Sequence, residues 1–535
     1  MSTATASTTV VRPVDRSFRN ALRLALFFAL IKLALHIGTN LWEAHIGWGY
    51  FRDEFYYLAC GNHLAWGYVD HGPVVALQAR IAETMFGHSL AGIRLLSAVA
   101  GALRVLLTGL LVWALGGRRP AQALAMIGIL LAPQYLGLDS FLSMNSWESF
   151  FWMACLLALI LLLRGRSIRA CWIVFGISAG IGLLNKPSMT FFLVALLIGL
   201  LLTPERRILF SRWSALGVAL MILIALPNLL WQVANHWPTL EFLHNGRVGH
   251  KNIALAPLPF LVQQVLNLNP VSIFLWGWGL LWLLFHRTAK SWRFLGLTYL
   301  LFLAGMMALH AKDYYVIPIY PILFAAGGLA WEQQFRNRPA VCDDRAFAFP
   351  VYETLLILTG LLTLPMAIPV LRPAPWIAYA KAIHLYDQSG NTENVSSGLL
   401  PQFYADRFGW QEEVDKIQTI VQHLSPEDRA HVGILANNYG EAGALDFLGH
   451  DLPPVISGHN TYWIWGPHDV GGQVLIVISG DPPDRFKEFC RQVEDEGRLN
   501  HPFSMPYERK HIYLLHDCRR PMSPKDDWIR YKHYF

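Results

Sequence analysis

Charged side chains are scarce in this chain of 535 residues: Asp, Glu, Lys and Arg make up only 15% of it, against ~25% in typical soluble domains. The six cysteines include no Cys-x-x-Cys pair, which excludes zinc-ribbon and thioredoxin-type motifs. Internal repeats are absent as well. Together with 20 Trp, 30 Phe and 19 Tyr, these absences exclude a collagen, a coiled coil and a disordered chain.

Hydrophobic residues are abundant instead, at 54% of the chain. They gather in runs that approach the ~20 apolar residues a helix needs to cross a bilayer. About eleven such runs are present: 20–40, 91–116, 121–137, 146–163, 170–184, 188–203, 213–232, 271–286, 294–309, 316–332 and 349–371. The first is too long for a cleavable signal and lacks a small-residue cleavage site. We therefore expect an α-helical polytopic membrane protein with about eleven transmembrane helices.

Basic residues distinguish the two ends of these spans. Five alternate connections hold 14 Lys and Arg in 42 residues: 117–120, 164–169, 204–212, 287–293 and 333–348. The opposite segments hold only 6 in 107 residues: 41–90, 138–146, 184–188, 233–269 and 310–315. The N-terminal tail adds Arg12, Arg16, Arg19 and Arg23 to the basic side. The positive-inside rule then predicts a cytoplasmic N-terminus and an extracytoplasmic C-terminal region. The membrane itself is expected to be a plasma (bacterial inner) membrane. A net charge of +6 distributed in this way does not indicate a nucleic-acid partner.

The composition changes near residue 373, so we divide the chain into a transmembrane domain (1–372) and a soluble α/β domain (373–535). Segments 431–436, 473–479 and 511–516 have strand patterns, whereas 408–424 and 484–496 have helical spacing. Cys490 and Cys518 both lie in this domain, on the oxidising side. A disulfide and two buried free thiols are equally compatible with this placement.

The first outer loop, 41–90, concentrates acidic residues. Asp53 and Glu54 are adjacent, and Tyr57 follows one helical turn later. The spacing of 55–65 predicts an amphipathic helix that lies at the membrane surface. An acid pair at a membrane edge is costly unless it is solvated or used, which favours a general base with an orienting or metal partner. The alternative is that the acids stabilise the N-terminus of a helix.

Several motifs resemble the membrane glycosyltransferases of the GT-C type, in particular family 39, the protein O-mannosyltransferase and lipid A aminoarabinose transferase superfamily. They are the "DExxY" and "DHGP" sequences of the first loop with "FGHSLAGIRLLSAVAG", then "GIGLLNKPSMTFFL", then "HAKDYYVIPIYPILFAAGGLAW". Together they cover roughly residues 20–335 and occur in the family's order. The resemblance implies transfer of a hexose or pentose from a polyprenyl-phosphate donor to an acceptor hydroxyl at the outer face.

The resemblance also assigns residues. Asp53 matches the catalytic acid and is expected to be the general base, with Glu54 beside it in the catalytic pair. Five residues are expected to bind the donor and its phosphate: Tyr57, Arg94, Lys186, Lys312 and Tyr315. Lys186 and Lys312 lie at span ends, where interfacial snorkelling is an alternative role. An ion pair with Glu83 is the alternative for Arg94.

Two departures from the family leave metal binding and the substrate open. Asn145 replaces a second outer aspartate, with Glu148 one turn later, and Asp70-His71 replaces a Glu-Lys pair. These four residues are expected to bind or orient the acceptor. Asp70, His71 and His250 are compatible with a divalent metal or with simple solvation; no other cofactor is implied. The acceptor is a glycan, a lipid or a protein, and the sequence predicts no oligomeric state.

A secondary transporter or flippase for a lipid-linked or small substrate is the alternative function. It predicts internal repeats and ionisable residues in mid-span. The chain shows no repeat, and its charges gather at the outer ends of the spans.

Overall fold

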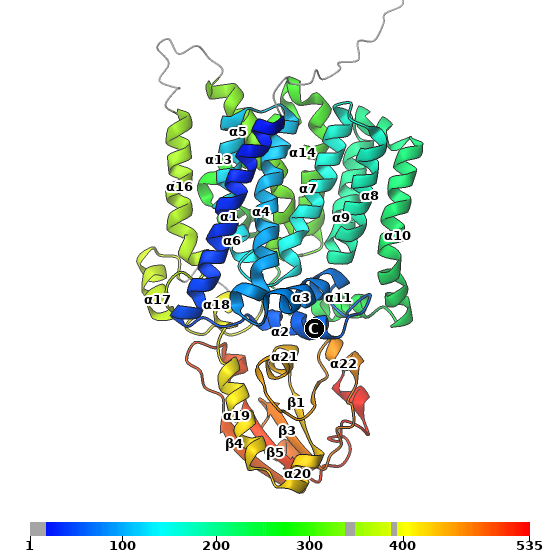
Figure 1. Ribbon diagram of the computed structural model, residues 1–535, viewed down its shortest axis with the longest axis vertical. Helices are drawn as coiled ribbons and strands as arrows, with labels where there is room; N and C mark the ends of the chain where they lie inside the picture. The colour runs from blue at the N-terminus through cyan, green and yellow to red at the C-terminus, as the bar shows by residue number, and fades with distance from the viewer. Residues whose placement is uncertain (1–17, 250, 252, 337–347, 387–392) are drawn as a thin grey trace, which may run out of the picture.

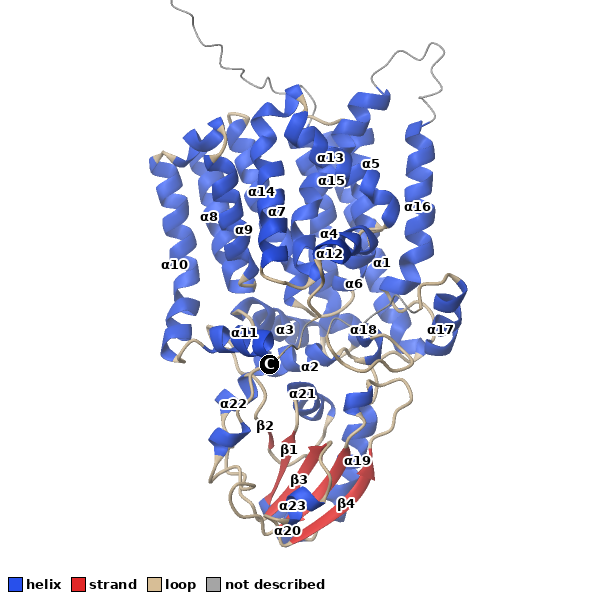
Figure 2. Ribbon diagram, turned by 180° about the vertical axis from the view of Figure 1, so that it is seen from behind, coloured by secondary structure: helices blue, strands red, loops and turns tan. Residues whose placement is uncertain are grey.

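The computed structural model describes residues 18–249, 251, 253–336, 348–386 and 393–535. Apolar helices form a bundle at one end of the molecule, and a smaller α/β domain caps the other end (Figures 1 and 2). The helices of the bundle are α1 (Phe18–Ile46), α4 (Leu90–Leu115), α5 (Arg119–Leu130), α6 (Pro133–Leu138), α7 (Met144–Leu163), α8 (Ile168–Asn185), α9 (Ser188–Leu201), α10 (Arg212–Ala234), α13 (Ile273–Phe285), α14 (Arg293–Ala308), α15 (Tyr320–Trp331) and α16 (Ala348–Ala367).

The protein is a multi-pass membrane protein, and each of the eleven expected apolar runs lies largely in a helix of this bundle. Within the described residues, eight helices are long and apolar enough to cross a bilayer. The count rises to nine if the pair Pro257–Asn267 and Pro270–Phe285, bent by 102°, is one span. The other runs give shorter helices: α9 has 14 residues, and α5 ends before Pro133, where α6 begins. Proline interrupts a helix because it cannot donate the backbone hydrogen bond.

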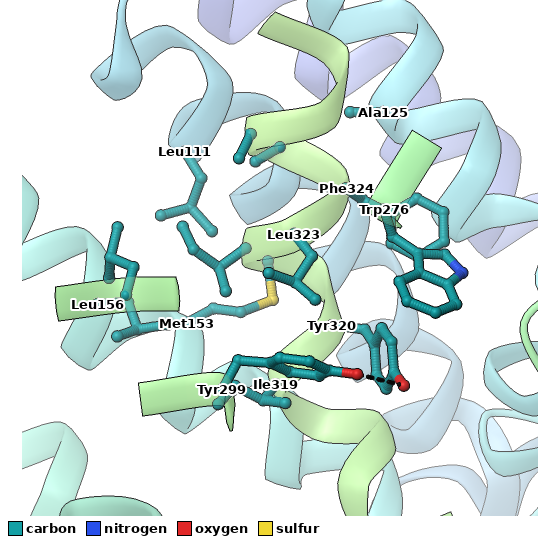
Figure 3. Close-up of a cluster of buried hydrophobic side chains, with 14 of the residues drawn as sticks. Leu111, Ala125, Met153, Leu156, Trp276, Tyr299, Ile319, Tyr320, Leu323 and Phe324 are labelled. Carbon is teal, nitrogen blue, oxygen red and sulfur yellow. Dashed lines mark hydrogen bonds between the residues drawn. The ribbon is translucent and has the colours of Figure 1, made fainter. Parts of the chain in front are cut away.

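Helix α15 lies at the centre of the bundle, and every one of its residues is buried. Its Gly327 and Gly328 allow close packing, since a Cβ there would lie 2.0 Å from the carbonyl oxygen of Leu275 and 2.4 Å from that of Ala121. Figure 3 shows the surrounding apolar side chains, with the Tyr299 and Tyr320 hydroxyls joined by a 2.9 Å hydrogen bond. The bundle is therefore closely packed around α15.

Short helices lie between the bundle and the α/β domain: α2 (Arg52–Asn62), α3 (Pro73–Phe86), α11 (Pro238–Val248), α17 (Pro373–Ala382) and α18 (Gln402–Ala405). A further short helix, α12 (Pro257–Asn267), lies at the level of the bundle (Figure 2). The helix expected over 55–65 is present as α2 at the end of the bundle, but residues 54–61 of it are buried and not open to solvent. The α/β domain packs on the side of α2 that was expected to face solvent, and its apolar residues share one cluster with those of α2 and α3.

The α/β domain is built on a five-stranded sheet of order β2-β1-β3-β5-β4. Its strands are β1 (Val432–Ala436), β2 (Val455–Ser457), β3 (Val474–Ser479), β4 (Gln492–Arg498) and β5 (His511–His516). Strand β1 pairs in parallel with β2 and β3, while β5 pairs antiparallel with β3 and β4. The helices are α19 (Trp410–His423), α20 (Pro426–His431), α21 (Tyr439–Leu448), α22 (Thr461–Trp465) and α23 (Asp484–Lys487).

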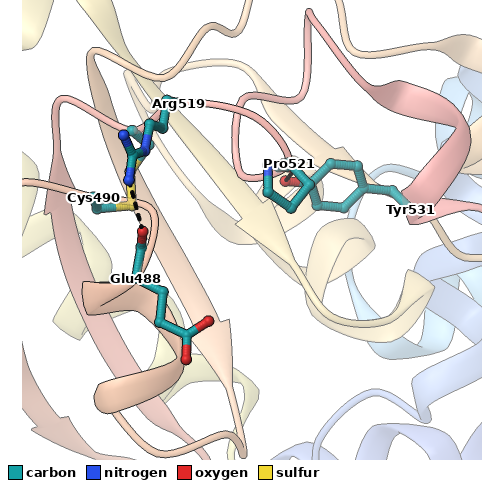
Figure 4. Close-up of a disulfide and its surroundings, with 6 residues drawn as sticks. Glu488, Cys490, Arg519, Pro521 and Tyr531 are labelled. Atoms are coloured by element: carbon teal, nitrogen blue, oxygen red, sulfur yellow. Dashed lines mark hydrogen bonds between the residues drawn. A yellow bond between two sulfur atoms is a disulfide. The ribbon is translucent and has the colours of Figure 1, made fainter.

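The three strands and the helix over 408–424 match the expectation, but the helix over 484–496 does not. Only Asp484–Lys487 is helical, and Gln492–Arg498 forms the edge strand β4. This strand is mostly polar and exposed, so it carries little of the apolar alternation that marks a strand. The structure also joins Cys490 and Cys518 in a disulfide (Figure 4), which leaves Cys60, Cys155 and Cys171 as buried free thiols among the described residues.

Residues 373–386 and 393–408, counted with the soluble domain in the sequence analysis, pack on the bundle. Trp376 and Tyr404 are buried in one cluster with Ile46 and Trp48, at the end of α1. The N-terminal end of α1 lies at the opposite end of the bundle (Figure 1). The two ends of the described chain thus lie on opposite sides of the membrane part, and the cytoplasmic side remains the one predicted from the basic residues.

Candidate functional site at the domain-facing end of the bundle

Asp53 and Glu54 both lie in the first turn of α2, but they have different partners. Glu54 Oε2 accepts a 2.8 Å hydrogen bond from the backbone N–H of Phe51, so Glu54 caps the helix. The Asp53 carboxylate instead accepts a 2.9 Å hydrogen bond at Oδ1 from the hydroxyl of Tyr439, and Arg52 Nε lies 3.6 Å from the same oxygen. The Asp53 side chain is 29% exposed. Asp53 is therefore not the helix cap, and a ligand can reach it.

Glu54 belongs to a buried ion-pair cluster of four residues, Glu43, Glu54, Arg94 and Arg407. Arg94 binds Glu54 through Nε and a terminal nitrogen, both at 2.7 Å, and also pairs with Glu43. Arg407 donates to Glu43 at 2.8 Å. All four side chains have no exposed surface or almost none. Arg94 pairs with these acids and not with Glu83, which lies near Arg80 and His88.

Lys186 ends α8 and points into a set of residues that the sequence had already named. Its Nζ donates to Asn145 Oδ1 at 2.7 Å and lies 3.0 Å from Glu148 Oε2. The same nitrogen lies 4.3 Å from the centre of the Tyr315 ring. Ser188 donates to the other oxygen of Glu148. Asn145 and Glu148 therefore hold the ammonium group of Lys186 against an aromatic face.

Lys312 precedes the short helix η4 (Asp313–Ile319), which carries Tyr315. Its Nζ lies 3.6 Å from Glu393 Oε1, and Lys251 Nζ lies 3.6 Å from the same oxygen. Burial acts to raise the pKa of Glu393, but Arg52, Lys251 and Lys312 outweigh burial and lower it to about 2. Burial lowers the pKa of Lys251. Glu393 is thus an ionised carboxylate between two lysines.

Tyr57, Asp70 and His71 lie on the other side of Asp53. The ring centres of Tyr57 and His71 are 5.2 Å apart. Asp70 Oδ1 accepts a 2.7 Å hydrogen bond from Tyr56, and burial raises the pKa of Asp70. The Nδ1 atom of His71 lies 2.8 Å from the carbonyl oxygen of Gly72, within hydrogen-bond distance. Burial lowers the pKa of His71. His71 is buried, whereas Asp70 is half-buried.

The structure tests the metal expectation only in part. In the ranges it describes, no group of three or more His, Cys, Asp and Glu residues is arranged to hold a metal ion. His250, which the sequence suggested as a third ligand, lies outside the described residues. Among the described residues, Asp70 and His71 thus have no third potential metal ligand grouped with them.

Aromatic side chains connect the acid to the lysines. Tyr57, one turn after Asp53, interacts electrostatically with both Asp53 and Tyr315, and Tyr315 carries Lys186 on its ring face. Lys251 also interacts with Asp53. Sequence reasoning did not name Tyr439, Lys251, Glu393 or Arg407 as functional, because each comes from a distant part of the chain.

Comparison with known proteins finds solved structures with a similar fold and a family model that matches one segment of the chain. Residues 70–231 match the family model described as dolichyl-phosphate-mannose-protein mannosyltransferase. Among solved structures, ArnT from Cupriavidus metallidurans bound to undecaprenyl phosphate has a TM-score of 0.56 at 14% identity, covering 93% of this chain and 98% of ArnT. Arabinofuranosyltransferase AftD from Mycobacteria has a TM-score of 0.54 at 13% identity, covering 95% of this chain and 41% of AftD. No curated protein sequence matches the chain.

These similarities confirm the resemblance drawn from the motifs. The family model covers less than half of the chain, and the identities to the solved structures are low, so the likeness concerns the fold and the matched segment. The chain has the fold of the GT-C membrane glycosyltransferases, and its segment 70–231 matches their protein mannosyltransferase family model.

Proposed function

We propose that this protein is a glycosyltransferase that moves a sugar from a polyprenyl-phosphate donor to an acceptor hydroxyl. The observation that carries the proposal is the partly exposed carboxylate of Asp53 at the end of the bundle that also holds Lys186, Lys251 and Lys312. A carboxylate can accept the proton of a hydroxyl, and lysines can stabilise the phosphate that leaves. The undecaprenyl phosphate in the related ArnT structure supports a donor of this class.

The reaction balances with these groups alone. Asp53 accepts the proton of the acceptor hydroxyl while the hydroxyl oxygen forms a bond to the anomeric carbon of the sugar. The bond between that carbon and the phosphate oxygen breaks, and its electron pair stays on the polyprenyl phosphate. We place Lys186 and Lys312 at that phosphate, with Tyr57 and Tyr315 between it and Asp53. Attack from the face opposite the phosphate inverts the anomeric centre.

The other named residues then support the site. Glu54 and Arg94 fix α2 against α4 and hold Asp53 in place, because their side chains are fully used by each other and by Glu43. Asn145 and Glu148 orient Lys186. Asp70 and His71 lie beside Tyr57, where they are placed to bind the acceptor. With the basic connections on the cytoplasmic side, the reaction takes place at the outer face.

Replacement of Asp53 tests the proposal. Purified wild-type protein in vesicles would be given radiolabelled undecaprenyl-phosphate hexoses and pentoses, with bacterial envelope lipid and protein as acceptors. We expect Asp53→Asn to lower transfer at least about a hundredfold, the lower end of what a general base contributes, without loss of insertion. Asp446→Asn is the matched control, because Asp446 accepts a hydrogen bond from Tyr462 within the α/β domain. Near-normal transfer by Asp53→Asn, or movement of the donor across the vesicle without transfer, would overturn the proposal.

A further inference from the structure

We propose that the α/β domain completes the catalytic site, and that Tyr439 is a positioning residue for the base Asp53. This inference rests on the proposed function. Tyr439 is the first residue of α21 and is separated from Asp53 by 386 positions in the sequence, yet its hydroxyl donates to Asp53 Oδ1 at 2.9 Å. The two carboxylate oxygens of Asp53 then have different roles, one toward Tyr439 and one toward the acceptor. In the part of the chain that the structure describes, the hydrogen bond and ion pair of Asp53 both involve Oδ1, which leaves Oδ2 for the acceptor.

Two glycines allow α21 to approach α2 closely enough for this contact. A Cβ on Gly440 would lie 2.4 Å from Cγ of Arg52, and a Cβ on Gly443 would lie 2.8 Å from the backbone carbonyl of Phe55. The two glycines are three residues apart, so they lie on the same face of the helix. The "YGEAG" sequence, which has no nucleotide-binding spacing, thus forms a helix-packing face.

Side-chain contacts also fix the direction of the Tyr439 ring. Asn438 caps α21 by accepting hydrogen bonds from the N–H groups of residues 440 and 441 at 2.8 and 3.1 Å. The Tyr439 ring stacks between Tyr56 of α2, at 4.6 Å, and His459, at 4.5 Å. A ring held on both faces has few alternative rotamers, so its hydroxyl stays directed at Asp53. Groups that orient a reactive side chain in this way act through it and do not touch the substrate.

A hydrogen bond from a neutral hydroxyl stabilises the charged form of a carboxylate. Removal of the Tyr439 hydroxyl should therefore move the acidic limb of the kcat/KM profile to higher pH. The other titratable or charged groups that interact with Asp53 stay in place in such a variant: Arg52, Tyr57, Asp70, His71, Lys251, Tyr314 and Asp406. Because a hydrogen bond to a charged group is worth about one pKa unit, the expected displacement is about one pH unit.

The experiment measures transfer from the radiolabelled undecaprenyl-phosphate sugar that the wild-type protein uses, between pH 4 and 9. Tyr439→Phe keeps the stacked ring, so we expect the shifted limb and a rate within about threefold of wild type at high pH. Tyr462→Phe is the matched control, since it removes a buried tyrosine hydroxyl that donates to Asp446 at 2.6 Å; its profile should be unchanged. Gly443→Ala pushes α21 away from α2 and so breaks the same hydrogen bond, and its acidic limb should move in the same direction as that of Tyr439→Phe, with a further loss of rate at high pH.

The inference fails if the Tyr439→Phe profile coincides with that of wild type, or if Tyr439→Phe and Gly443→Ala lower the rate in the same pH-independent way. A double-mutant cycle on thermal unfolding gives a second measurement that needs no substrate: the Tm shifts of Asp53→Asn and Tyr439→Phe should not add, since the two side chains contact each other. Additive shifts would contradict the contact. An active Asp53→Asn variant would instead contradict the proposed function, whatever Tyr439→Phe does.

Discussion

The two adjacent acids of α2 show how differently neighbouring residues can be used. Glu54 is completely buried, and its two oxygens accept hydrogen bonds from Arg94 and from two backbone N–H groups. Asp53 is 29% exposed and, within the described parts of the chain, accepts a single hydrogen bond, from Tyr439. A carboxylate whose lone pairs are all engaged has no capacity left for a substrate proton. Charge at the membrane edge therefore does not distinguish the two acids, whereas the incompletely satisfied carboxylate of Asp53 makes it the better candidate for the proposed base.

The same contrast separates the cations of the two regions. In the ion-pair cluster, two guanidinium groups face two carboxylates, so the buried charges balance. Around Asp53, three lysines share two acids: Lys186 has Glu148, while Lys251 and Lys312 share Glu393. Two lysines that share one carboxylate suit a phosphate that would arrive with the donor. We therefore expect the ion-pair cluster to stabilise the fold and the lysine region to bind the donor.

The largest effect that this comparison predicts is on stability, from Arg94→Met. The substitution leaves Glu43 and Glu54 buried with only Arg407, and an uncompensated buried charge costs ~3–5 kcal/mol. We expect a large loss of folded protein on heating, measured by size-exclusion chromatography with fluorescence detection. The matched control is Arg80→Met on α3, whose side chain is 50% exposed and lies 3.9 Å from Glu83; a surface pair of this kind contributes ~0–1 kcal/mol.

Equal thermal stability of Arg94→Met and Arg80→Met would contradict the structural role of the buried ion-pair cluster. If Arg94→Met folded normally but lost affinity for undecaprenyl phosphate, Arg94 would be a donor-binding residue, as the family resemblance first implied.

A smaller effect, on binding, is expected for Lys186→Met. Loss of a charge-assisted hydrogen bond to phosphate, worth ~1.5–3 kcal/mol, corresponds to a Kd for undecaprenyl phosphate that rises about ten- to a hundredfold. Lys381→Met is the control, because Lys381 also lies over a tyrosine ring, that of Tyr386 at 5.0 Å, but on the exposed helix α17. Unchanged affinity in Lys186→Met would leave Lys186 as a structural partner of Glu148.

The sequence sufficed for the helical membrane fold, for the α/β domain and for the neighbourhood of Lys186. Apolar runs and their spacing are local properties, so they survive without tertiary information. Asn145, Glu148, Lys186 and Tyr315 follow from motifs at the ends of helices, and the structure brings all four together.

The sequence did not reveal which of two adjacent acids is enclosed. That depends on Arg407, which reaches Glu43 across 364 positions, and on Tyr439, which reaches Asp53 across 386. No local pattern encodes contacts over such distances, and no apolar run marks residues such as Arg407. The error at β4 has a related cause, since "QVEDEGR" is an edge strand whose pairing with β5 supplies what its own pattern lacks.

The smallest predicted effect is a change in donor affinity on replacement of Glu393, the acid that two of the lysines share. Its carboxylate lies 3.6 Å from both Lys251 and Lys312, so it competes with the donor phosphate for them. We expect Glu393→Gln to bind undecaprenyl phosphate about two- to fivefold more tightly, because the contacts are partly exposed and each is worth ~0–1 kcal/mol. The pKa of Glu393 is lowered from 4.5 to about 2, so its stabilising charge is fully present above about pH 4.5 and is lost only as the pH falls toward 2. The gain in affinity should therefore be constant from pH 6 to 8 in a binding titration. Weaker binding by Glu393→Gln would mean that this acid holds the lysines in place for the phosphate instead of competing with it.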